Sequence, residues 1–113
     1  MDVVTLRRAL TTALKARDAV AVSALRSALA AVENAGAVEA SHAPSPGSGP
    51  IAGAVAGLGA SEVERRPVDV RAVVAAEVEH RRAAAREYVD LGRPDRADRL
   101  TAEADVLAVH LQS

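Results

Sequence analysis

Residues 77–111 constrain the fold of this chain more than any other stretch, because they span two helical patterns and the break between them. Apolar residues recur at helical spacing over residues 68–91, and again, at alternating spacings of three and four, over residues 94–112. Gly92 suits the position just after a helix, where a left-handed backbone costs glycine little. Pro94 suits the first turn of the next helix. The pattern predicts two antiparallel helices joined by a turn of three or four residues.

A second pair of helices is expected near the start of the chain. Residues 2–17 place their apolar side chains on one stripe, and residues 18–40 repeat theirs at the narrow spacing of a coiled-coil seam. The members of that seam are Val22, Leu25, Leu29, Val32 and Gly36. Asp18 is placed to cap the second helix. The connection is so short that two arrangements stay open: an antiparallel hairpin, or one helix that continues through a kink.

Residues 41–61 differ from the rest of the chain. They contain three of the five prolines, five of the seven glycines and no charged residue, which is typical of a flexible linker. We therefore expect a single all-α domain over residues 1–113: a four-helix up-down bundle of two helical hairpins with a flexible Gly/Pro-rich connection. Alanine supplies 27 of the 113 residues and Tyr88 is the only aromatic residue. This predicts closely packed helices around a thin core, which a second copy or another partner would complete.

Composition excludes several classes of protein. The 14 basic and 15 acidic residues nearly balance, so no basic domain of the nucleic-acid-binding kind is present. Without cysteine there is no disulfide and no thiolate catalysis. No apolar run approaches the ~18 residues of a membrane span, and Arg7 and Arg8 interrupt any secretory signal. A cytoplasmic location is the expectation.

The hairpin region also carries a family resemblance, over about 35 residues without a gap. An acidic residue, basic residues and an aromatic residue precede Gly92-Arg93, and a second helix follows. The residues involved are Glu77, Val78, Arg81, Tyr88, Gly92, Arg93, Asp95, Ala97, Glu103, Leu107 and Leu111. Near the start, Leu14-Lys15-Ala16-Arg17-Asp18, Leu25-Arg26 and Asn34 match as well. In order and spacing these residues resemble the GatB/YqeY family.

The resemblance to the GatB/YqeY family implies an all-helical fold and a relation to an accessory region of tRNA-dependent amidotransferases. It implies tRNA or a translation-related protein as partner. The family's chains continue into a small C-terminal helical tail, the part associated with tRNA in the amidotransferase B subunit, and we expect this chain to be without it.

Six arginines crowd the predicted hairpin, and acidic neighbours stand at helical spacing from them. The predicted pairs are Glu77–Arg81, Glu79–Arg82, Arg86–Asp90, Asp95–Arg99 and Arg99–Glu103. Such pairs contribute about 0.2–0.5 kcal/mol each and indicate a solvated, salt-bridged face. Arg93, in the turn before a helix N-terminus, is the best placed to meet an external anion. The candidate nucleic-acid-binding residues are Arg93, Arg82, Arg86 and Arg96.

Nothing in the sequence forms a catalytic set. The three histidines lack metal-ligand spacing, and no phosphate-binding loop or activated nucleophile is present. Glu77 and Glu103 lie near the two predicted seams, where they could face one another as a pair for acid–base chemistry, but pairing of each with Arg81 or Arg99 is the favoured interpretation. We expect no catalytic residue, no metal and no cofactor.

Three functional hypotheses follow from the residues and the resemblance. The first is a non-catalytic helical adaptor of the GatB/YqeY type, associated with tRNA or tRNA-dependent amidation. The second is a protein-interaction or self-associating helical module with no role in RNA binding. The third, by family association alone, is an amidotransferase-related activity, that is, a carbon–nitrogen ligase with glutamine as amido-N-donor.

Overall fold

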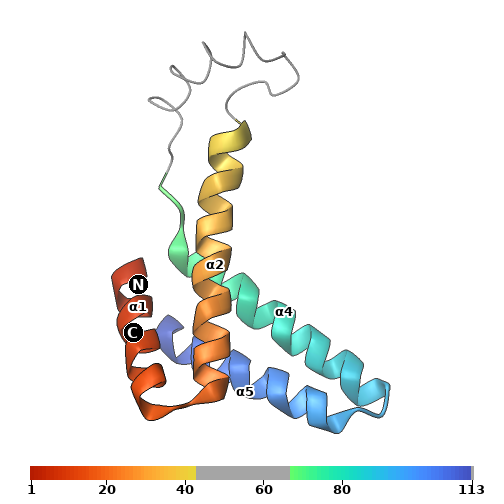
Figure 1. The fold of residues 1–113 in the computed structure, drawn as a ribbon. Coiled ribbons are helices and arrows are strands. Elements are labelled where there is room, and N and C mark those ends of the chain that lie inside the picture. The colour runs from red at the N-terminus through yellow and green to blue at the C-terminus, as the bar shows by residue number, and fades with distance from the viewer. Residues whose placement is uncertain (43–66, 113) are drawn as a thin grey trace. The chain divides into compact units, whose positions relative to one another are not determined.

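The computed structural model describes residues 1–42 and 67–112, and every regular element in these ranges is a helix. The helices are α1 (Val3–Ala16), α2 (Ala19–His42), α4 (Val70–Asp90) and α5 (Pro94–Leu111) (Figure 1). The all-α prediction with four helices is confirmed over the described residues. Each predicted boundary lies within two residues of the observed one. Of the predicted linker 41–61, the first two residues belong to the last turn of α2 and the remainder lies outside the described residues.

Aspartate caps start three of the helices. The carboxylate of Asp2 accepts a hydrogen bond from the backbone N–H of Thr5 at 2.8 Å, that of Asp18 from Ala21 at 3.1 Å, and that of Asp69 from Ala72 at 3.0 Å. Each bond satisfies an N–H that the first helical turn leaves without a backbone partner. The predicted cap at Asp18 is confirmed.

A left-handed residue separates α1 from α2. Arg17 has a φ of 55°, and its N–H donates to the carbonyl of Leu14 at 3.2 Å while that of Asp18 donates to Ala13 at 3.0 Å. This pair of bonds closes the C-terminus of α1 as a Schellman motif. The chain therefore turns at residues 17 and 18, and a single kinked helix is excluded.

The chain divides into two compact units. The first is Met1–Ala31 with Asp69–Ser113, and the second is Val32–Val68. In the second unit, Val32 is buried and Gly36 lies beside Val68, so that a Cβ at position 36 would meet Val68 Cγ2 at an ordinary 3.5 Å.

The core of the first unit takes side chains from all four helices. Leu6, Leu25, Val74 and Leu107 are fully buried, one from each helix. Several alanines, among them Ala24, Ala28 and Ala104, are equally buried and belong to the same cluster. Small side chains let helix backbones approach closely, so the prediction of a thin, alanine-rich core agrees with the described residues.

The buried face of α2 is centred differently from the predicted seam. Leu25 and Val32 are buried as expected, but Val22 and Leu29 are only partly buried. Among residues 19–37 of the helix, whose burial the structure describes, the other buried positions are alanines: Ala21, Ala24 and Ala28. The prediction followed the larger side chains, whereas the close contact in the structure is made by the small ones.

Helices α4 and α5 lie side by side as the predicted hairpin (Figure 1). Gly92 has a φ of 74°; its N–H donates to Val89 at 3.0 Å and that of Arg93 donates to Tyr88 at 2.8 Å, a second Schellman motif. Pro94 is the first residue of α5. At the other end of the hairpin, the guanidinium of Arg71 donates to the carbonyl of Leu111. Both ends of the hairpin are thus fixed by hydrogen bonds.

Candidate functional site

A chain of ion pairs crosses the middle of the α4–α5 hairpin. Arg81 Nη1 lies 3.0 Å from Glu77 Oε1, and Arg81 Nε lies 3.1 Å from Glu103 Oε1. The second oxygen of Glu103 accepts from Nε of Arg99 at 3.1 Å. The side chains of Arg81 and Glu103 are each 12 % exposed. The four charges alternate in sign, and we call them the Arg81 network.

The Arg81 network also reaches α2, because the hydroxyl of Ser27 donates to Glu77 Oε1 at 3.3 Å. Arg81 further donates to the backbone carbonyl of Glu77 at 3.2 Å. Among the described residues, no buried side-chain nitrogen or oxygen lacks a hydrogen-bond partner. The little-exposed side chains of Arg81 and Glu103 thus link α4 to α5, and Ser27 links the Arg81 network to α2.

The two carboxylates considered for acid–base chemistry both belong to the Arg81 network. Glu77 and Glu103 do come together from different helices, but Arg81 lies between them and bonds to both. The favoured interpretation of these residues, ion pairing, is confirmed. The geometry supports a structural role for both carboxylates.

Other predicted ion pairs are replaced by contacts that cross the hairpin or its turn. Arg82 pairs with Asp105 of α5 at 3.2 Å and not with Glu79 of its own helix, because the antiparallel partner offers a carboxylate alongside it. Asp95 faces Arg93 at 3.6 Å, since the Nε of Arg99 is turned to Glu103. The prediction was wrong for these two partners, which depend on how the helices pair, and the predicted Arg86–Asp90 pair is absent as well, since both side chains are exposed and form no ion pair with a described residue. The predicted Glu77–Arg81 and Arg99–Glu103 pairs are both present.

The structure places the four candidate nucleic-acid-binding arginines in different surroundings. Arg82 is held by Asp105, and Arg93 lies beside Asp95. Arg86 is exposed and forms no ion pair with any described residue. Arg96 lies with its Cζ 5.7 Å from the centre of the Tyr88 ring, within the range of a cation–π contact. Two of the four arginines, Arg86 and Arg96, thus form no ion pair with a described carboxylate.

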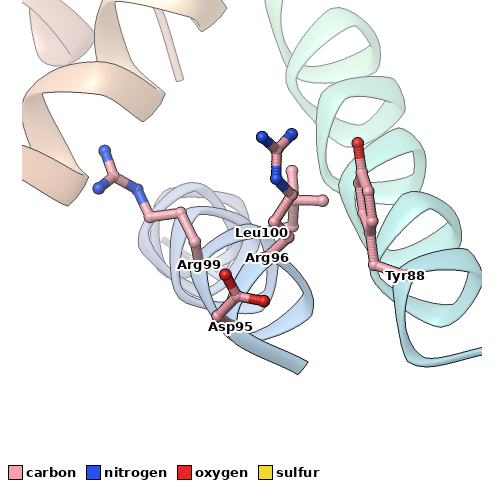
Figure 2. A pocket seen from close by; sticks show the side chains of 5 residues that line it. All are labelled: Tyr88, Asp95, Arg96, Arg99 and Leu100. Atoms are coloured by element: carbon pink, nitrogen blue, oxygen red, sulfur yellow. The ribbon is translucent and has the colours of Figure 1, made fainter. Parts of the chain in front are cut away.

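A surface depression of about 410 Å³ lies between the helices near the turn (Figure 2). Tyr88 supplies one wall from α4, and α5 supplies the others: Asp95, Arg96, Arg99 and Leu100. Its volume is in the range of small ligand-binding clefts. The sequence predicted packing for Tyr88 and gave no sign of this depression, because its residues meet only after the hairpin closes.

The N-terminus of α5, which is the positive end of its helix dipole, adjoins this depression and lies beside the carboxylate of Asp95. The backbone N–H of Arg96, and to a smaller extent the guanidinium of Arg93, hold the pKa of the Asp95 carboxyl below its ordinary value. Asp95 therefore stays ionised, and its carboxylate in the first turn offsets part of the positive end of the helix. Of the two arginines that line the depression, Arg99 is paired with Glu103, whereas Arg96 forms no ion pair with a described residue.

The segment of residues 85–100, here called the turn end, lies outside the core of its unit. Ala85 and Ala97 are buried, yet neither is part of the core cluster that α1 and α2 share. Val89 is 61 % exposed and Leu91 is 71 % exposed. Val89 continues the predicted apolar face of its helix, but it is exposed because it lies beyond the core cluster that α4 shares with α1 and α2. The turn end is thus an exposed projection with apolar side chains.

A second depression lies on the exposed face of α1 and is lined by that helix alone: Val4, Arg7, Arg8, Thr11 and Thr12. In the described ranges no three histidine or acidic side chains gather as they would around a metal ion. None of the described helices is both long and apolar enough to cross a membrane.

No family model matches this chain, and comparisons with curated proteins and with solved structures find no significant match.

Proposed function

We propose that this chain is a non-catalytic helical adaptor that binds a protein partner through the turn end of the α4–α5 hairpin. The observation that carries the proposal is the exposure of Val89 and Leu91 beside a depression lined by Tyr88 and Arg96. Tyrosine and arginine are enriched among residues that dominate protein interfaces. Apolar side chains that project from a core, on a segment fixed by its own hydrogen bonds, suit a preformed docking surface.

Charge supports a protein over a nucleic acid as the partner. The turn end contains four arginines and four acidic residues, so it carries no net positive charge. Phosphate backbones are bound mainly by surplus lysine and arginine. The Arg81 network, with its two carboxylates engaged, supports a scaffold role for the middle of the hairpin.

The resemblance to the GatB/YqeY family gives this adaptor a setting. It suggests a partner in the translation apparatus or in tRNA-dependent amidation, and action in the cytoplasm. The amide-transfer chemistry would belong to that partner. A second copy of the chain is the alternative occupant, since the thin core suits self-association.

Affinity capture from cells that make the protein tests the proposal. Tagged wild-type protein is compared with the double variant Leu91→Ala/Arg96→Ala and with the control Arg7→Ala on α1, after nuclease treatment. We expect a protein that is retained by wild type and by the control and lost from the double variant. Proteins captured equally by all three, or none captured, would contradict the proposal. Sedimentation equilibrium of the same variants identifies self-association as the outcome instead.

Association with tRNA is the second candidate, favoured by Arg86 and Arg96, which form no ion pair with a described residue. A mobility-shift assay with bulk tRNA at ~50 mM and ~200 mM salt tests it. Phosphate contacts would make binding fall steeply with salt and weaken in Arg86→Ala and Arg96→Ala. The absence of a shift at the lower salt rules this candidate out.

A further inference from the structure

The depression at the turn end combines an apolar surface with a guanidinium, that of Arg96, that forms no ion pair with a described residue. Tyr88 and Leu100 are half-buried and supply the apolar surface, and Arg96 lies against the ring of Tyr88. Figure 2 shows Arg96 and Leu100 on the side of α5 toward Tyr88, whereas the Arg99 side chain extends away from Tyr88. A planar ring and a guanidinium in contact form one continuous binding face.

The charges around this face are not equivalent. Asp95 is engaged by the start of α5 and by Arg93, as its lowered pKa indicates. Arg99 uses Nε for Glu103, and its side chain remains about half exposed. Arg96 is exposed and forms no ion pair with a described residue. A ligand at the depression therefore meets guanidinium donors, and its complement is a carboxylate.

We propose that the depression binds an acidic peptide segment that places one large apolar side chain on Tyr88 and Leu100 and a neighbouring carboxylate on Arg96. The inference rests on the proposed adaptor function and names the chemistry of its partner. A planar guanidinium held by an aromatic ring binds a carboxylate through two parallel hydrogen bonds. The apolar residue supplies the buried area that a surface ion pair alone does not.

A phosphate-bearing ligand fits this surface less well. The turn end balances four arginines against four acidic residues. A nucleic acid would bring a row of phosphates past Asp95, Asp98 and Asp90, whereas a peptide brings one or two carboxylates to a single point. Charge complementarity at the depression thus favours the acidic peptide.

Tyr88 provides a direct readout, because the chain contains no tryptophan and no other tyrosine. A random dodecapeptide display library is selected on the whole chain, with depletion on Arg96→Ala. Enriched peptides without tyrosine or tryptophan are synthesised and titrated while the fluorescence of Tyr88 is recorded. We expect enriched sequences with net negative charge around a leucine, phenylalanine or methionine, and a saturable change in Tyr88 fluorescence.

Three variants and one competing probe decide the outcome. Arg96→Ala should weaken binding by about tenfold or more, as expected for loss of a charge-assisted pair. Arg96→Lys should restore part of the affinity, and Arg7→Ala should leave it unchanged. Basic or uncharged enriched peptides, binding unaffected by Arg96→Ala, or no enrichment at all would overturn the inference. So would an Arg96-dependent fluorescence change with a 12-mer RNA and none with peptides.

The two proposals fail in different ways. A partner captured from cells through Leu91 and Arg96, together with an unproductive peptide selection, refutes the acidic-segment inference and leaves the adaptor function standing. If the capture of a partner does not depend on Leu91 and Arg96, the adaptor function itself is refuted.

Discussion

Arg81 of α4 donates to Glu103 of α5 across a separation of 3.1 Å, with both side chains 12 % exposed, and this contact is the centre of the hairpin. Arg81 bonds in addition to Glu77, and Glu103 to Arg99, so four alternating charges are shared between two helices. Removal of one member of such a set destabilises a fold, because it leaves the partner's charge uncompensated in a poorly solvated place. The hairpin therefore depends on Arg81 in a way that its exposed arginines do not share.

Replacement of Arg81 by methionine should lower the free energy of unfolding by about 2–3 kcal/mol, below the ~3–5 kcal/mol of a fully buried pair. The cost arises because Glu77 and Glu103 keep their charges without the group that lies between them. In the background of Glu77→Gln/Glu103→Gln, the same replacement should cost much less. Urea unfolding followed by circular dichroism measures all four proteins. An equal cost in both backgrounds would show that Arg81 acts through packing alone.

Gly92 should be sensitive to substitution for a reason of backbone geometry. Its φ is 74° and a Cβ there would meet no atom within 4 Å, so Gly92→Ala introduces strain without a clash. We expect a loss of about 1 kcal/mol. Gly36→Ala is the matched control, because Gly36 is helical with room for a Cβ, and the replacement should stabilise by up to about 1 kcal/mol. Thermal unfolding should show shifts of opposite sign, and shifts of the same sign would contradict this account.

Arg17 is the one described non-glycine residue with a positive φ. Its left-handed backbone closes α1, and a side chain at that position has a conformational cost that glycine lacks. Arg17→Gly should therefore raise the midpoint of thermal unfolding, by an amount equivalent to roughly 0.5–1 kcal/mol. Arg17→Ala serves as the control for loss of the guanidinium. Stabilisation by alanine to the same extent would assign the effect to charge.

The cap at Asp2 should make stability depend on acid pH. The backbone N–H of Thr5, followed by its hydroxyl, lowers the pKa of the Asp2 carboxyl. A group whose pKa is lowered by folding stabilises above the unfolded pKa, and that stabilisation is lost as the pH falls through the folded value. The advantage of wild type over Asp2→Asn, which keeps an acceptor but does not titrate, should shrink below about pH 4. A difference that is constant from pH 7 to pH 3 would contradict the assignment.

The elements of this fold could be predicted because their signals are local. Asp18 precedes an apolar repeat, and Gly92 precedes Pro94. Each of these signals depends only on hydrogen bonds within one helical turn, and each predicted a cap that the structure shows. Burial was harder to predict, because it depends on which helix covers which face. Val89 continues the apolar stripe of α4 but lies beyond the reach of α1 and α2, so it is exposed.

The candidate site could be predicted only in part, since its contacts join residues of different helices. The pairs Glu77–Arg81 and Arg99–Glu103 lie four residues apart on one helix and were predicted. The bond from Arg81 to Glu103 and the pair Arg82–Asp105 depend on the register of the hairpin. The depression at Tyr88 depends on that register as well. The apolar periodicity of a single helix does not determine how two helices align, so the depression could not be predicted.

Hydrogen exchange of the whole chain, alone and with the captured partner, tests most directly whether the turn end is the docking surface. The account predicts that the partner slows amide exchange in residues 85–100, with little change in α1 or around Arg81. The same measurement on Arg96→Ala, at equal partner concentration, should show less protection. Protection confined to α1, or spread evenly over the chain with residues 85–100 unchanged, would contradict the central claim.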